Sequence, residues 1–115
     1  MLNDSSQLDR AFQALSDPLR RGMLAQLSRG PASVSELAQP LSISLPAVLQ
    51  HLKALEHSGL VRSEKKGRVR TVRLEGEVLA SAESWLTQRR TEWEAQLDRF
   101  ENYLQTLKAN GEEND

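Results

Sequence analysis

Two histidines are the first candidates for catalytic or metal-binding chemistry, because the chain contains no cysteine. His51 and His57 lie in a segment that we expect to be helical, where a separation of six residues places them roughly 240° apart around the axis. They cannot bind one metal ion from a single helix face, and neither has another ligand at a chelating interval. We expect His51 to be a hydrogen-bonded packing residue rather than one that contacts a partner molecule. His57 lies in the last turn of this helix, where a partly charged imidazole suits the negative end of the helix dipole. The sequence predicts no metal site and no cofactor.

The sequence also lacks the other arrangements on which enzyme catalysis depends. Catalysis requires a nucleophile beside a base, two facing carboxylates, or a metal ion. The histidines have no obvious partner serine and aspartate, and the six glycines are scattered rather than gathered in a phosphate-binding loop. We therefore expect that the protein is not an enzyme.

The composition favours a small cytoplasmic protein with no membrane partner. Without cysteine there is no disulfide framework and no thiol switch. No apolar run approaches the ~18 residues that would span a bilayer, and the start, MLNDSSQLDR, does not resemble a signal peptide. The chain of 115 residues is 38% apolar, below the usual ~45–50%. We expect one domain over residues 1–115 with a modest core, completed by a partner chain.

The net charge of −1 is distributed unevenly along the chain. Residues 43–75 contain seven basic and three acidic side chains, whereas residues 76–115 contain four basic and nine acidic ones. A basic middle beside an acidic end suggests that the middle faces a polyanion. A solvated charged face would give the same pattern, so charge alone leaves both interpretations open.

The apolar spacing and the capping residues predict four helices, a hairpin and a long last helix. Asp17-Pro18 and Ser44 are typical helix starts, and Ser33-Val34-Ser35-Glu36 fits a capping box. Gly59 fits a left-handed C-cap. The predicted helices cover residues 5–15, 18–28, 33–39, 44–58 and 77–109, with β-prone runs at 60–65 and 68–74 on either side of Lys66-Gly67. We expect residues 1–4 and 110–115 to be disordered.

This order predicts a mainly α fold with a small β-hairpin, in which residues 33–58 form a helix-turn-helix and residues 60–75 form a wing. In the helix over 44–58, Val48, Leu52 and Leu55 share one side and should be buried. The opposite side has the layout of a recognition helix, whose first residues meet base edges in the major groove. The predicted DNA-binding residues of this segment are Ser42, Ser44, Pro46, Ala47, Leu49, Gln50 and Lys53.

Each of these side chains suggests a specific contact with double-stranded DNA. The Gln50 amide could pair with adenine, and Leu49 and Ala47 could touch thymine methyl groups. Ser42 and Ser44 lie beside a helix N-terminus, where phosphate binds readily.

The hairpin tip is the second basic feature. Solvated surface charge would explain it, but its place directly after a helix-turn-helix favours contact with the DNA backbone or minor groove. The predicted DNA-binding residues here are Lys65, Lys66, Arg68 and Arg70, with Arg73 following them.

The last helix carries an apolar stripe at heptad spacing, with Arg90 at one position of the stripe. From Leu79 to Leu107 it would be ~43 Å long, too long to fold back into a small core. We expect it to pair with a second copy of itself, so the chain should be a homodimer. The predicted interface residues of this helix are Leu86, Trp93, Leu97, Phe100 and Leu104. The two tryptophans, Trp85 and Trp93, could pack there or line an effector pocket between the subunits.

Three segments together resemble the ArsR-type winged-helix transcriptional repressors: ALSDPLRRGMLAQL (14–27), SVSELAQPLSISLPAVLQHLKALEHSGLV (33–61) and EKKGRVRTVRL (64–74). The resemblance covers roughly residues 8–74. It implies a homodimer held by the first and last helices, which adds Leu8 and Phe12 of the first helix to the predicted interface. It also implies that this homodimer binds a near-palindromic operator and often represses its own operon.

The chain departs from this family's pattern at the positions that would bind metal. Metal-sensing members carry a cysteine pair in the region matching Ser33 to Ala38, or histidine and acidic ligands on the last helix. This chain has no cysteine, and its last helix has no histidine, so it looks closer to the metal-independent branch. Leu49 stands where many members have serine or threonine, which suggests an apolar contact at that position.

Two function classes follow from the sequence. The first is a sequence-specific DNA-binding transcriptional regulator, a homodimeric repressor that could also respond to an unidentified small-molecule effector. The alternative is a winged-helix protein-interaction module or adaptor without specific DNA binding, recruiting partners through the acidic last helix. The basic middle segment favours the first, because an adaptor that binds only protein has no need of it.

Overall fold

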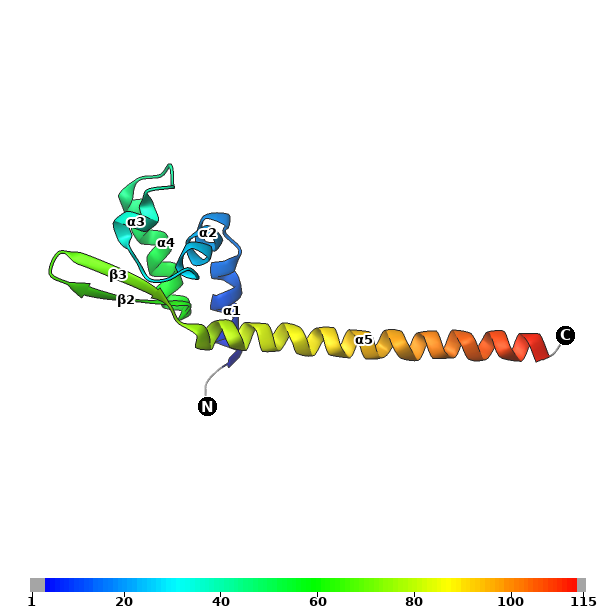
Figure 1. Cartoon of the computed structure of the whole chain (residues 1–115). Helices are drawn as coiled ribbons and strands as arrows, with labels where there is room; N and C mark the ends of the chain where they lie inside the picture. The colour runs from blue at the N-terminus through cyan, green and yellow to red at the C-terminus, as the bar shows by residue number, and fades with distance from the viewer. Residues whose placement is uncertain (1–3, 114–115) are drawn as a thin grey trace. The chain divides into compact units, whose positions relative to one another are not determined.

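The computed structural model describes residues 4–113, which form five helices and three short strands. The last helix is much longer than the others (Figure 1). The elements in order are α1 (Asp4–Leu15), α2 (Pro18–Leu27), β1 (Ala32–Ser33), α3 (Val34–Ala38), α4 (Leu45–Ser58), β2 (Val61–Lys66), β3 (Val69–Leu74) and α5 (Gly76–Glu113). This confirms the predicted mainly α fold with a helix-turn-helix and a wing. The chain divides into two units, one up to Ala82 and one from Glu83 onward. They are described separately below.

Side-chain caps start three helices where the sequence predicted them. Asp17 accepts hydrogen bonds from the backbone N–H groups of Leu19 and Arg20, at 2.8 and 3.1 Å. The bond from Arg20, ahead of that from Leu19, holds the pKa of Asp17 below its ordinary value. Ser33 and Glu36 form the reciprocal capping box, and the backbone N–H of Ser33 lowers the pKa of Glu36.

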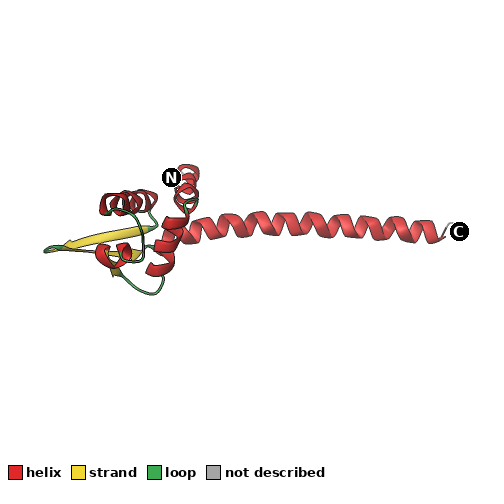
Figure 2. Cartoon of the chain, turned by 90° about the horizontal axis from the view of Figure 1, so that it is seen from above, coloured by secondary structure: helices red, strands yellow, loops and turns green. Residues whose placement is uncertain are grey.

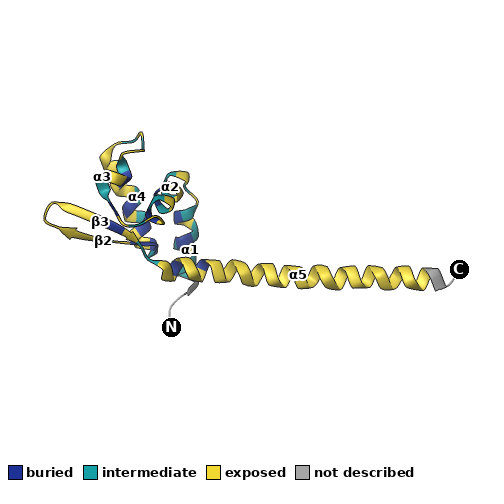
Figure 3. Cartoon of the chain, viewed as in Figure 1, coloured by how far each residue is buried: buried dark blue, intermediate teal, exposed yellow. Residues whose placement is uncertain are grey.

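The core of the first unit lies between the helices and the sheet (Figure 3). Val48, Leu52 and Leu55 are buried, as the spacing in α4 predicted. From α2, Met23 and Leu27 are buried. Leu19 and Leu24 of the same helix are only partly buried. The core fixes which side of α4 remains for other molecules.

The sheet has three antiparallel strands in the order β1-β3-β2, one strand more than the predicted hairpin. Figure 2 draws its strands in yellow. Ala32 pairs with Val72 and Ser33 with Thr71. A strand of two residues carries no alternating pattern of its own, so this pairing could not be predicted. The hairpin turn consists of Gly67 and Arg68, because β2 continues through Lys66, one residue further than predicted. Gly67 has a φ of 63°, which suits glycine at this turn position.

Gly59 ends α4 and allows a close approach to the start of α5. Its φ is 83°, the left-handed conformation expected of a C-cap. A Cβ built on Gly59 would lie 2.8 Å from Cγ2 of Val78, which is itself buried. Both backbone conformation and space therefore require glycine here.

The helix α5 is longer than the predicted 77–109. It contributes Val78 and Ala82 to the buried residues of the first unit, and every side chain from 83 to 111 is exposed in the single chain. The prediction of disordered ends was wrong for Asp4 and for 110–113, which are helical, and otherwise falls outside the described residues. None of the helices within 4–113 is both long and apolar enough to cross a bilayer.

Candidate nucleic-acid interface

The first turn of α4 presents polar groups outward. Ser44 is the N-cap, and its Oγ accepts a hydrogen bond from the backbone N–H of Ala47 at 3.3 Å. The hydroxyl proton is still available to donate to an acceptor such as a phosphate oxygen. Ser42, Ser44 and Pro46 are exposed, whereas Ala47 is half-buried. Three of these four predicted DNA-binding residues are therefore exposed on the surface.

The next turns of α4 expose the remaining predicted side chains. Gln50 and Lys53 are exposed, and Leu49 is 44% exposed although it is a large aliphatic residue. Within residues 4–113, the side chains of Gln50 and Lys53 form no hydrogen bond or ion pair. They are free to bind another molecule.

The cations of the wing fall into two groups. Arg62 pairs with Glu75 at 3.2 Å, and Arg73 approaches Glu64 at 3.9 Å. In contrast, three predicted DNA-binding cations at the tip have no hydrogen-bond or ion-pair partner among the described residues: Lys65, Lys66 and Arg68. The unpaired positive charge of the wing is concentrated at its tip.

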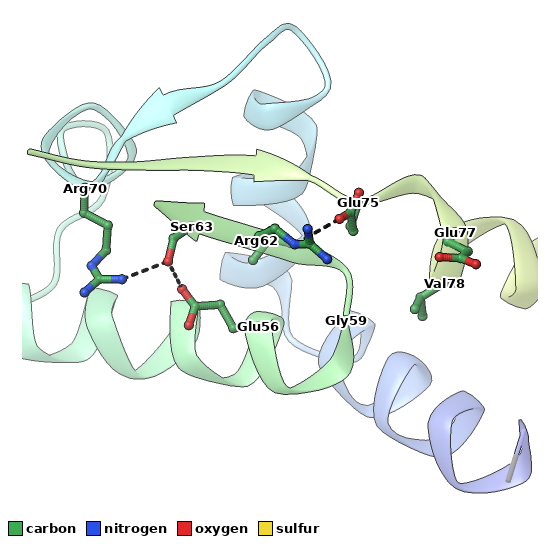
Figure 4. A pocket seen from close by; sticks show the side chains of 9 residues that line it. Glu56, Gly59, Arg62, Ser63, Arg70, Glu75, Glu77 and Val78 are labelled. Carbon is green, nitrogen blue, oxygen red and sulfur yellow. Dashed lines mark hydrogen bonds and ion pairs between the residues drawn. The ribbon is translucent and has the colours of Figure 1, made fainter. Parts of the chain in front are cut away.

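Arg70, also predicted to bind DNA, takes part in a network that joins the wing to α4 (Figure 4). Its Nη1 donates to Oγ of Ser63 at 2.9 Å, and the Ser63 hydroxyl donates to the Glu56 carboxylate. Glu56 and Ser63 were not predicted from the sequence as part of the site. The network restrains one guanidinium nitrogen of Arg70 and links the wing to α4.

A hollow of about 380 Å³ lies between α4 and the wing, and we refer to it as the helix–wing hollow. Four predicted DNA-binding residues line it: Leu49, Lys65, Arg68 and Arg70. Leu45, Val69 and residues 33–35 also line it, and none of these was predicted from the sequence. Leu45 could not be recognised as a site residue because it is the first residue of α4, directly after the Ser44 cap. Val69 could not be recognised because a valine is an ordinary residue in a β-strand.

A second hollow lies on another side of α4, lined by residues that include Gln50, Lys53 and His57. There Arg20 of α2 joins three segments: Nε donates to the Ala14 carbonyl at 2.8 Å, Nη2 to Gln13, and Nη1 lies 3.3 Å from Nδ1 of His51. Arginine can only donate, so Nδ1 of His51 is the acceptor in this contact. His51 is partly buried and hydrogen-bonded, as predicted.

The predicted dimer residues divide between the two units. Leu8 and Phe12 of α1 are partly buried in the first unit. On α5, the five predicted residues are 42–61% exposed in the single chain: Leu86, Trp93, Leu97, Phe100 and Leu104. Trp85 lies under the Arg89 guanidinium, 5.0 Å from the ring centroid. An exposed stripe of this size on one helix leaves a large apolar surface to be covered.

No cluster of three histidine, aspartate or glutamate side chains that could hold a metal ion occurs in the part of the chain that the structure describes. Glu64 of the wing and Glu75, directly after it, face arginines instead.

Comparison with known proteins gives a consistent set of relatives. Residues 15–64 match a family described as a helix-turn-helix domain. The HTH-type transcriptional regulator Rv2034 of Mycobacterium tuberculosis is 45% identical over 73 residues, which are 64% of this chain and 68% of that protein. The transcriptional repressor SdpR of Bacillus subtilis is 29% identical over 79 residues, 69% of this chain and 88% of the repressor.

Solved structures agree with these sequence relatives. The crystal structure of an ArsR family transcriptional regulator, RHA00566, is 48% identical and superimposes with a TM-score of 0.76, covering 82% of this chain and 97% of that one. An ArsR-like transcriptional regulator from Rhodococcus sp. RHA1 is 35% identical with a TM-score of 0.73, over 86% of this chain and 93% of that chain.

Proposed function

The chain belongs to the ArsR family of winged helix-turn-helix transcriptional regulators, and we propose that it is a homodimeric repressor that binds an inverted-repeat operator. Residues 33–58 act as the helix-turn-helix and residues 60–75 as the wing. Residues 5–15 and 77–109 form the dimer interface. The named relatives are regulators rather than enzymes.

This proposal rests mainly on which cations of the wing and of α4 have an internal partner and which have none. Within residues 43–75, the lysines and arginines that have no internal partner lie at the wing tip, in Lys65, Lys66 and Arg68, and on the outer side of α4, in Lys53. Unpaired cations on two elements suit a phosphate backbone, which supplies most of the sequence-independent affinity for DNA. Gln50, also free and on the same helix, is the side chain that we assign to a base edge.

Dimerisation is supported by the exposed stripe on α5. Three of its residues, Trp93, Phe100 and Leu104, are 61%, 57% and 47% exposed in the single chain. Burying such side chains contributes roughly 1.5–3 kcal/mol each, so a second copy of the helix is the natural partner. A two-fold dimer would place its recognition helices about 34 Å apart, one DNA turn, which requires an inverted repeat.

We assign the protein to the metal-independent branch of its family because it lacks the usual metal-ligand residues. It has no cysteine, and α5 contains no histidine. Any signal that it senses would then be an unidentified small molecule, for which the surface around Trp85 and Trp93 is one candidate place.

The test is binding to DNA from immediately upstream of the protein's own gene. Fluorescence anisotropy at several salt concentrations compares that duplex with a scrambled one. Preference for the native duplex, with affinity that falls steeply with salt, supports a self-regulating repressor. Equal, weak binding to both duplexes contradicts autoregulation. The absence of binding even at low salt contradicts the DNA-binding assignment and favours the protein-interaction module.

A further inference from the structure

Three aliphatic side chains that lie outside the buried core meet at the helix–wing hollow. Leu45, Leu49 and Val69 are 55%, 44% and 53% exposed, and all three line the hollow. Leu45 and Leu49 are four residues apart and share one face of α4. Val69 is the first residue of β3, next to the hairpin turn. Exposed apolar side chains that gather in one place mark a binding surface, unlike those scattered singly.

The charge around the hollow indicates what kind of molecule fits there. Lys65, Arg68 and Arg70 also line it, and none of its lining residues is a carboxylate. A partner must therefore present negative charge and apolar groups together. Double-stranded DNA does so, because the thymine methyl is the apolar group of the major groove and phosphates flank it.

The two hollows place neighbouring residues of α4 on different sides. Leu49 lines the helix–wing hollow, whereas Gln50 lines the hollow that Arg20 and His51 share. A recognition helix that enters the major groove would therefore direct Gln50 to one base pair and Leu49 to a neighbouring one on the wing side.

We propose that Leu45 and Leu49, with Val69 beside them, bind the methyl group of a thymine in each operator half-site, on the wing side of the base pair that Gln50 contacts. Lys65 and Arg68 hold the flanking phosphates. This inference rests on the proposed function and deepens it, since it assigns a base preference that depends on an apolar contact instead of a hydrogen bond.

The experiment begins by selecting bound duplexes from a randomised pool with the full-length protein. In the selected duplex each thymine is then replaced singly by deoxyuridine, which removes only the methyl group. Loss of one buried methyl should weaken binding about fourfold, and loss from both half-sites about fifteenfold. The dissociation constants are measured by anisotropy at one fixed salt concentration.

Two variants assign the effect to the hollow. L49A should bind the thymine and uracil duplexes equally at the sensitive position, and it should fold normally because Leu49 lies outside the core. The matched control K66A should weaken binding to both duplexes and leave their ratio unchanged. Selection that enriches a sequence in which no thymine is sensitive overturns this inference alone, as does a L49A variant that keeps the ratio. Selection that enriches no sequence overturns the proposed function and this inference with it.

Discussion

Removing the unpaired cations of the wing should reduce the salt dependence of DNA binding by a predictable amount. The variant K65Q/K66Q/R68Q removes three side chains that have no internal partner among the described residues. Each phosphate contact contributes about 0.9 to the slope of log K against log salt, so three contacts in each of two protomers contribute about 5. The slope is measured by fluorescence anisotropy on the selected duplex between 50 and 200 mM salt, concentrations chosen because the effect is large there.

A matched pair of single variants separates specific contact from net charge. K66Q and R73Q each remove one positive charge per protomer, but the Arg73 guanidinium lies 3.9 Å from the Glu64 carboxylate whereas Lys66 has no such partner in the described chain. K66Q should lower the slope by about 2 per dimer, and R73Q by much less. Circular dichroism confirms that both variants fold. An unchanged slope in the triple variant, or an equal loss in K66Q and R73Q, would refute the assignment of phosphate contacts to the wing tip.

Four further predictions follow from the recognition helix, the long helix and the helix ends. Q50A should lose preference at one base pair per half-site while other positions keep theirs; a binding profile over all single base changes that matches the parent's would refute the assignment. W93R should sediment as a monomer because the charge would enter the apolar stripe; a persistent dimer would place the interface elsewhere. G59A should lower the free energy of unfolding by about 1 kcal/mol or more, since φ is positive and Val78 blocks the Cβ; an unchanged urea midpoint would contradict this. The pKa of Asp17 is lowered in the folded state. Its stabilising effect is therefore fully present above the pKa of an unfolded aspartate, about 3.9, and is lost as the pH falls through the lower pKa of the folded protein. D17A should therefore lower the urea midpoint at neutral pH, and the difference from the parent should shrink in acid; a difference that stays constant down to pH 2 would show that the carboxylate is not the cause.

The helix-turn-helix was largely predictable because its signals are short-range. The Ser33–Glu36 capping box and the Ser44 cap each join groups three residues apart, so the chain has the same partners whether or not it is folded elsewhere. The burial of Val48 and Leu52 follows from the helical repeat. The predicted binding side of α4 follows in turn, since it is the side that the core leaves free.

The remaining features depend on residues that meet only after packing. Arg20 and His51 are 31 residues apart, and their contact requires α2 to lie against α4. The Glu56–Ser63–Arg70 network requires the wing to lie beside α4. No local pattern distinguishes Arg70 from Arg68, and yet one is hydrogen-bonded and the other is free.

The sequence by itself therefore determined the order of the elements, the helix caps and the side of α4 that the core leaves exposed, because propensity, periodicity and capping act over a few neighbouring residues. Only the tertiary structure decided which cations are unpaired, how β1 joins the sheet, and that Leu45, Leu49 and Val69 meet at one hollow. Those features arise from contacts between distant segments, and their geometry is set by how the core packs.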